Sequence, residues 1–174
     1  MFQRFAPIAT LVLALSLLAP VPALADSEPQ TYFFELEAPN VAQAPNGDRV
    51  AVTGEGTFSV NSKSVDAEGS FTHTFAGGGS ISGTWAATEL LAFQPYGCGV
   101  VFGSPIPENL CGGQVKLRVT LTVGASRLDG ILTVFCLIGT NVPHSADEGI
   151  TLVVPGIINF NDVVTGENVY VRLD

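Results

Sequence analysis

Basic residues are scarce in this chain: its 174 residues include 7 Lys and Arg against 16 Asp and Glu, a formal net charge of −9 at pH 7. A surface this acidic repels the phosphates of nucleic acids and the head groups of anionic membranes. The sequence therefore predicts no nucleic-acid partner and no membrane-surface role. Charged residues of both signs make up only 13% of the chain, whereas 47% are hydrophobic, which is enough apolar material for a packed core and excludes a disordered chain.

Residues that bind metals or form catalytic sites are also few, with three cysteines and two histidines in the whole chain. There is no Cys-x-x-Cys pair and no cluster of histidines, so the sequence predicts no zinc site. It shows no phosphate-binding loop, nucleophile elbow or paired carboxylates, and we predict no cofactor. The oxygen-rich segments 143–148 and 159–162 lack the spacing of an EF-hand, and we interpret them as solvated turns rather than calcium sites.

The sequence has one long hydrophobic run, close to its start. Arg4 precedes an apolar stretch from Ile8 to Leu18, and Ala23-Leu24-Ala25 fits the small-x-small pattern of a cleavage site. This pattern predicts a signal peptide over residues 1–25, removed after Ala25. The run is shorter than the roughly 20 residues that a membrane-spanning helix needs. We therefore expect a single secreted or extracytoplasmic domain over residues 26–174, with no transmembrane segment in the mature chain.

No segment after residue 26 keeps a helical period over three turns, whereas many alternate polar and apolar residues between Gly, Asn, Asp and Pro. The sequence thus predicts an all-β fold with short turns, an antiparallel meander. The expected strands are Thr31 to Glu37, Val50 to Val60, Val65 to Phe75, Ser80 to Phe93, Gln114 to Val123, Gly130 to Ile138, Ile150 to Val154, Ile157 to Phe160 and Asn168 to Leu173. About eight amphipathic strands suit an up-and-down barrel or a two-sheet sandwich. Meander connections and glycines within strands favour the barrel.

The three strands between Val50 and Phe93 allow a specific pairing to be predicted. Turns at residues 61–64 and 77–79 would place large residues opposite small ones on one face. The expected pairs on that face are Val60 with Val65, Phe58 with Ala67, Gly56 with Gly69, Gly54 with Phe71, Val52 with His73, Phe75 with Ile81, His73 with Gly83, Phe71 with Trp85 and Gly69 with Ala87. The opposite face is rich in Ser and Thr. We therefore expect one face to form the core and the other to contact solvent.

The segment from Gly130 to Ile138 differs from the other predicted strands because both of its faces are apolar. We expect it to be covered on both faces, by the C-terminal segment or by a partner. An uncovered apolar face marks an interface, so this strand is a candidate surface for self-association.

Several of these strand and turn patterns resemble a known group of proteins. The run Ser82-Gly83-Thr84-Trp85-Ala86-Ala87-Thr88-Glu89-Leu90-Leu91-Ala92-Phe93, followed by Tyr96-Gly97, resembles a segment of small exported bacterial all-β proteins of uncharacterised function. Three further segments look similar: Gly56-Thr57-Phe58-Ser59-Val60, Gly69-Ser70-Phe71-Thr72-His73 and Ile131-Leu132-Thr133-Val134-x-Cys136. The resemblance covers about half of the chain and implies export and an all-β fold, but no activity. The expected architecture is also similar to the eight-stranded barrels of allene oxide cyclase and dirigent proteins, although no functional motif of theirs is matched here.

Export would make a disulfide possible among the three cysteines. Cys98 and Cys111 flank the longest irregular stretch that we predict, residues 94–113, and a bridge between them would close that loop. Cys136 alternates with apolar residues and is interpreted as a small buried side chain with an inert thiol. The alternatives are a bridge from Cys136 to either of the other two, or no bridge, because the sequence does not decide connectivity.

Three residues on the predicted core face are candidate ligand-binding residues. His73 would line an interior cavity, or would be a neutral ring packed beside Gly83. Glu89 would be a carboxylate in apolar surroundings, or would lie near the end of the sheet and pair with Lys63. Trp85 would be a ligand platform, or a core residue.

These observations lead to three hypotheses about function. The first is a non-enzymatic binding or structural module whose ligand contacts residues 94–113 or the mouth of the barrel. The second is a small barrel enzyme, an isomerase or cyclase, with His73 as the polar group of an apolar cavity. The third is a component of a surface assembly that associates through residues 130–138.

Overall fold

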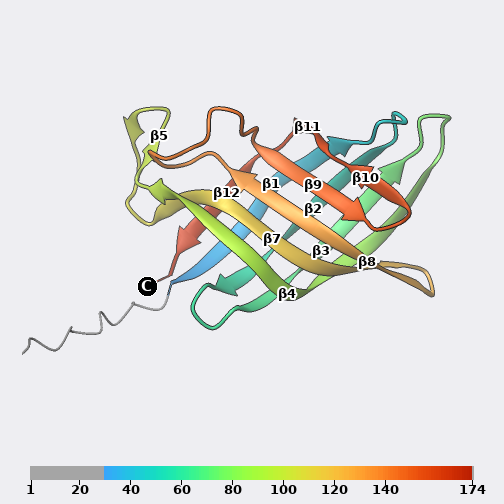
Figure 1. Cartoon of the computed structure of the whole chain (residues 1–174), viewed down its shortest axis with the longest axis horizontal. Helices are drawn as coiled ribbons and strands as arrows, with labels where there is room; N and C mark the ends of the chain where they lie inside the picture. Colours follow the sequence, from blue (N-terminus) through green and yellow to red (C-terminus); the bar gives the residue numbers. More distant parts are fainter. Residues whose placement is uncertain (1–29, 174) are drawn as a thin grey trace, which may run out of the picture.

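The structure is a computed structural model that describes residues 30–173, which form antiparallel β-strands and no helix (Figure 1). The strands are β1 (Thr31–Gln43), β2 (Arg49–Ser59), β3 (Ser64–Thr74), β4 (Ser80–Cys98), β5 (Val100–Val101), β6 (Ser104–Pro105), β7 (Leu110–Val123), β8 (Ser126–Cys136), β9 (Gly149–Val154), β10 (Ile158–Phe160), β11 (Asp162–Thr165) and β12 (Asn168–Arg172). The all-β prediction is confirmed, and each expected strand overlaps an observed one. The predicted signal peptide lies outside the described residues. No helix in the described part of the chain is long and apolar enough to cross a membrane.

Ten strands form one antiparallel sheet in which chain neighbours are mostly sheet neighbours. The sheet order is β10-β9-β8-β7-β12-β1-β2-β3-β4, with β11 beside β1. A further pairing of β7 with β4 closes a ring of six strands: β1, β2, β3, β4, β7 and β12. The predicted meander is therefore confirmed. The ring closes with six strands rather than the eight or so expected. Strands β8 to β10 continue the sheet from β7, outside the ring.

The β2–β3 and β3–β4 hairpins both pair two residues away from the predicted register. Ser59 lies opposite Ser64, so the turn spans 60–63, and Lys63 takes a positive φ of 53°. In the next hairpin Phe71 lies opposite Gly83 instead of Trp85. Two residues are one full period of a strand, so the predicted faces are correct although the partners are not.

The interior of the ring contains a cluster of aromatic side chains. The ring centroids of Phe58 and Phe93 are 4.9 Å apart, and those of Tyr32 and Phe58 are 5.2 Å apart. Tyr170 contacts the same cluster, and its buried hydroxyl donates a hydrogen bond to the carbonyl of Val134 at 2.8 Å. This hydrogen bond satisfies the buried hydroxyl of Tyr170, and the rings around it form a packed core.

The doubly apolar segment that we singled out forms β8, which lies inside the sheet. Residues 131–135 pair with β7 along one edge and with β9 along the other. Leu132 and Val134 are buried, whereas Ile131 and Phe135 on the other face are only partly exposed. Because both edges are occupied there, self-association through this strand remains a prediction that would have to use its outer face.

Cys98 and Cys111 form the predicted disulfide. They are direct partners at the ends of β4 and β7, so the bridge lies at the base of a projection that carries the small β5–β6 hairpin. The prediction that residues 94–113 are irregular is wrong at both ends of this range, because β4 and β7 pair as far as Cys98 and Cys111. Cys136 is a free, buried cysteine, as interpreted, and burial raises the pKa of its thiol to about 12.

Candidate functional site

An apolar pocket of about 230 Å³ opens at one end of the molecule. In Figure 1 this is the right-hand end, where the turns that follow β1, β3, β7 and β9 gather, opposite the β5–β6 hairpin. Its lining residues come from seven strands and the adjoining turns: Val50, Phe71, His73, Phe75, Ile81, Leu121, Val123, Leu128, Leu152, Val154, Ile157, Ile158 and Phe160. All but His73 are hydrophobic.

Strand pairing explains why His73 faces this pocket. His73 lies opposite Val50 on one neighbouring strand and opposite Ile81 on the other, and all three line the pocket. The β9–β10 hairpin adds Phe160, whose ring packs edge-on against the imidazole with centroids 5.1 Å apart. The ring of Phe75 contacts the imidazole as well, at 4.4 Å. His73 is thus held between aromatic rings at the edge of an apolar space.

The mouth of the pocket carries an unusual concentration of exposed hydrophobic side chains. Among the described residues seven large hydrophobic side chains are exposed, and four of them line this pocket: Phe75 (38%), Ile81 (41%), Leu128 (40%) and Ile157 (63%). Single exposed hydrophobic residues are ordinary, but a group around a concave apolar surface is typical of a binding site.

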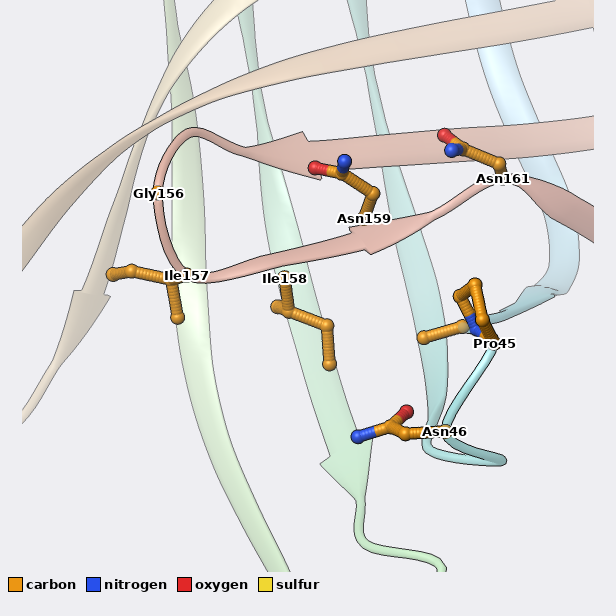
Figure 2. Close-up of a pocket in the computed structure, with 8 residues that line it drawn as sticks. Pro45, Asn46, Gly156, Ile157, Ile158, Asn159 and Asn161 are labelled. Carbon is orange, nitrogen blue, oxygen red and sulfur yellow. The ribbon is translucent and has the colours of Figure 1, made fainter.

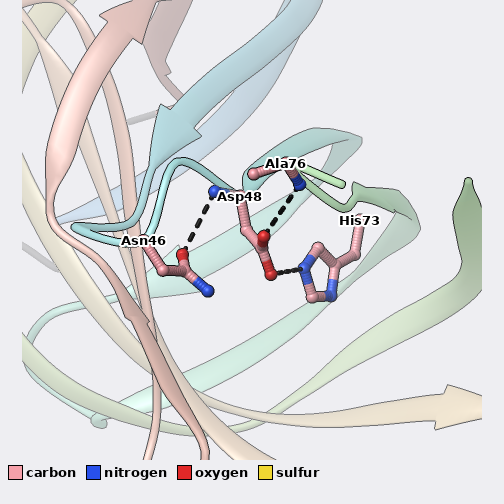
Figure 3. A network of polar contacts seen from close by, with 4 residues as sticks. All are labelled: Asn46, Asp48, His73 and Ala76. Carbon is pink, nitrogen blue, oxygen red and sulfur yellow. Dashed lines mark hydrogen bonds and ion pairs between the residues drawn. The ribbon is translucent and has the colours of Figure 1, made fainter. Parts of the chain in front are cut away.

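A partly buried polar network holds His73 in place at the pocket (Figure 3). His73 Nε2 lies 2.8 Å from Asp48 Oδ2, with side-chain exposures of 14% and 11%. The second carboxylate oxygen accepts a hydrogen bond from the backbone N–H of Ala76 at 2.9 Å. The backbone N–H of Asp48 in turn donates to Asn46 Oδ1 at 3.1 Å. The network ties the turn after β1 to the end of β3 and the turn that follows it.

The Ala76 N–H and the hydrogen bond from His73 hold the pKa of Asp48 below its ordinary value. An ionised carboxylate only accepts hydrogen bonds, so Nε2 of His73 must carry the proton in this pair. In the neutral imidazole Nδ1 is then the acceptor nitrogen. Asp48 therefore fixes both the orientation and the tautomer of the ring.

The three candidate ligand-binding residues lie in three different environments: the pocket, the core and the surface. His73 lines the pocket. Trp85 is a core residue with 2% exposure, and its Nε1 donates to the carbonyl of Thr53 at 2.9 Å. The prediction that Glu89 faces inward is wrong: the pairing shifts between Ala87 and Glu89, and the extra residue reverses the alternation. Glu89 is exposed and accepts a hydrogen bond from Arg118 Nε at 2.9 Å, not from Lys63.

Asp48 was not among the predicted site residues, although the sequence held a signal for it. It ends the segment Asn46-Gly47-Asp48, whose residue types are typical of a tight turn. With the observed register Val50 lies opposite His73, so Asp48 is the next residue on the same face of the strand. The predicted register, which pairs Val52 with His73, leaves Asp48 too far along the strand; the observed register brings its carboxylate to the histidine.

A second pocket, of about 500 Å³, lies beside the β5–β6 hairpin and contains carboxylates. Its lining includes Glu37, Glu148 and Glu167 together with Phe102, which is 88% exposed. Among residues 30–173, no group of three or more His, Cys, Asp or Glu is arranged to hold a metal ion. Burial raises the pKa of Glu148 to about 7, and the neighbouring Glu167 and Glu37 act in the same direction.

This raised pKa predicts a pH-dependent stability. The N–H groups of Leu137 and Asn168 donate to the two oxygens of Glu148, at 2.6 and 3.0 Å, which favours the ionised form, but the effect of burial is larger. A carboxyl whose pKa is higher in the folded than in the unfolded chain stabilises the fold most below its unfolded value, and this contribution is lost as pH rises.

We therefore expect the free energy of unfolding of the wild type, minus that of Glu148→Gln, to fall between about pH 4.5 and about pH 7 and to level off above. Urea denaturation of both proteins from pH 4 to pH 9 measures this difference. A difference that is constant with pH, or that rises with it, contradicts the assignment.

Comparison of the chain with protein-family models, curated protein sequences and solved structures gives no match.

Proposed function

We propose that the protein is a non-enzymatic binding module that holds a small apolar group in the His73 pocket. The observation that carries the proposal is the convergence of Phe75, Ile81, Leu128 and Ile157 on the mouth of a space whose other walls are also apolar. Leaving these side chains in water has a cost in free energy, and a ligand that covers them recovers it.

The volume of the pocket limits the size of the group. At about 230 Å³ the pocket is below the usual range for drug-sized ligands, which begins at roughly 300 Å³, but above the roughly 150 Å³ that suffices for benzene. A chain of about six carbons is a reasonable occupant. At about 0.8 kcal/mol for each buried CH₂, six carbons contribute about 5 kcal/mol, which corresponds to a dissociation constant on the order of 0.1 mM.

We place this module outside the cytoplasm. The Cys98–Cys111 disulfide supports this location, because disulfides persist in oxidising compartments and are rare in the cytosol. The predicted signal peptide over residues 1–25 and the resemblance to exported bacterial proteins are in line with it.

Hexan-1-ol is a suitable probe, followed by amide chemical shifts in the folded protein. We expect saturable shifts confined to the residues that line the pocket and their neighbours in the chain, with none at the β5–β6 hairpin. The variant Ile157→Asn removes an exposed apolar side chain from the mouth and should weaken binding about tenfold, the equivalent of about 1.4 kcal/mol.

Val164→Asn is the matched control, since Val164 is an exposed apolar residue on β11 that does not line the pocket. It should bind hexan-1-ol like the wild type. Equal losses in the two variants, or shifts that do not saturate, would contradict a specific pocket.

A second candidate function rests on the Asp48–His73 pair. An ionised carboxylate that orients an imidazole at an apolar pocket is an arrangement suited to a general base, as an isomerase or cyclase requires. A small ketone tests it: cyclohexanone in D₂O would exchange its α-protons faster with the protein than with the variants His73→Gln and Asp48→Asn. Equal exchange rates in all three, with saturable binding of hexan-1-ol, support the binding module over the enzyme.

A further inference from the structure

We infer that the ligand is an amphiphile with an uncharged, hydroxylated head group, which binds in a polar pocket next to the apolar one. This inference rests on the proposed function, because it assigns a ligand class to the same end of the molecule. The polar pocket has a volume of about 440 Å³ (Figure 2). Its lining residues are Ala44, Pro45, Asn46, Gly156, Ile157, Ile158, Asn159 and Asn161.

The two pockets are adjacent, since both are lined by Ile157 and Ile158. Figure 2 shows these residues on the β9–β10 hairpin and Asn46 on the facing turn. A single ligand could therefore place an aliphatic chain among the hydrophobic residues on one side of the hairpin and its head group among the asparagines on the other.

The turn after β1 connects the two halves of the site. Asn46 lines the polar pocket, and its Oδ1 accepts the backbone N–H of Asp48. Asp48 binds His73, which lines the apolar pocket. Because one hydrogen-bonded network fixes a residue of each pocket, the two halves are held in a fixed relation to each other (Figure 3).

The chemistry of the polar lining selects the head group. Its polar side chains are three asparagines, and it contains no ionisable residue. An amide offers both donors and an acceptor, which matches hydroxyl groups, themselves donors and acceptors. An anionic head group would find no Lys or Arg in the lining and would meet a chain of net charge −9. A cationic head group would find no carboxylate in the lining.

The test compares three eight-carbon amphiphiles by calorimetry, each below the concentration at which it forms micelles or separates from water. The probes are n-octyl-β-D-glucoside, octan-1-ol and octanoate. We expect the glucoside to bind about tenfold more tightly than octan-1-ol, and octanoate to bind more weakly than both. The double variant Asn159→Ala/Asn161→Ala should reduce glucoside affinity to that of octan-1-ol and leave octan-1-ol binding unchanged.

Asn141→Ala serves as the control, because Asn141 is an exposed residue at the other end of the molecule, where its backbone N–H binds the carbonyl of Tyr96. It should bind all three probes like the wild type. If octan-1-ol binds and the glucoside binds no better, or if octanoate binds best, the inference about the head group is overturned while the apolar pocket stands. If none of the three binds, the proposed function fails as well.

Discussion

Replacing Gly69 with alanine is expected to lower the free energy of unfolding by about 3 kcal/mol, as severe overpacking of a core does. A Cβ at this position would overlap the carbonyl oxygen of Thr53 and would lie 2.6 Å from Nε1 of Trp85. Those two atoms form a hydrogen bond with each other at 2.9 Å. The added methyl group would therefore break a buried hydrogen bond and also displace the largest side chain of the core.

Gly77→Ala is the control for this prediction. Gly77 lies in the turn between β3 and β4, and a Cβ there has no atom within 4 Å. We expect a change of less than about 0.5 kcal/mol, since exposed substitutions away from special features have small effects. Urea denaturation of the two variants measures both values. Similar losses in both would show that glycine is needed only for chain flexibility, and not for space under Trp85.

The same packing explains why the register was missed although the faces were predicted. Large residues do lie opposite small ones, with Gly69 opposite Trp85 and Phe71 opposite Gly83. Shifting both hairpins by two residues keeps every side chain on its face, so the polar and apolar pattern does not distinguish the two registers. The observed register also places Gly54 opposite Gly69, and the indole occupies the space above both. The volume of the indole, which fits over these two glycines, therefore favours the observed register over the predicted one.

The position of Glu89 shows a second limit of reading a sequence by alternation. The prediction assumed an unbroken period of two along β4, but the strand contains three irregularities, the first of them just before Glu89. A bulge adds one residue and reverses the side chains that follow it, as far as the next bulge. The sequence contained a warning, because a carboxylate on a predicted core face is itself an argument that the alternation breaks there.

The candidate site depended on contacts between distant parts of the chain. The alternation of the strand is enough to place His73 on the core face, but its partner Asp48 is 25 residues away and follows only from the correct register. The pocket also needs the β9–β10 hairpin, which places Ile157 and Phe160 beside β3. Local patterns predict that such short strands exist. Which surface they cover is decided by tertiary packing, which those patterns do not contain.

Removing the disulfide is the second change with a large expected effect. Cys98 and Cys111 are 13 residues apart in the chain, and closing a loop of this length is worth about 3 kcal/mol, mainly by restricting the unfolded chain. The double variant Cys98→Ala/Cys111→Ala should therefore melt roughly 6–12 °C below the wild type. Because these residues end a long run of pairs between β4 and β7, we expect the fold itself to survive, with unchanged far-ultraviolet circular dichroism.

A reducing agent provides the control. It should lower the melting temperature of the wild type to that of the double variant and leave the variant unchanged, because Cys136 is buried, unpaired and has no disulfide to lose. Equal shifts in both proteins would assign the effect to something other than the bridge. No shift in the wild type would mean that pairing of β4 with β7 already restricts the loop in the unfolded ensemble, and the entropic account of this bridge would be wrong. Hexan-1-ol binding should persist in the double variant, since the bridge lies beside the β5–β6 hairpin and the β9–β10 hairpin, which lines the pocket, lies at the opposite end of the molecule (Figure 1).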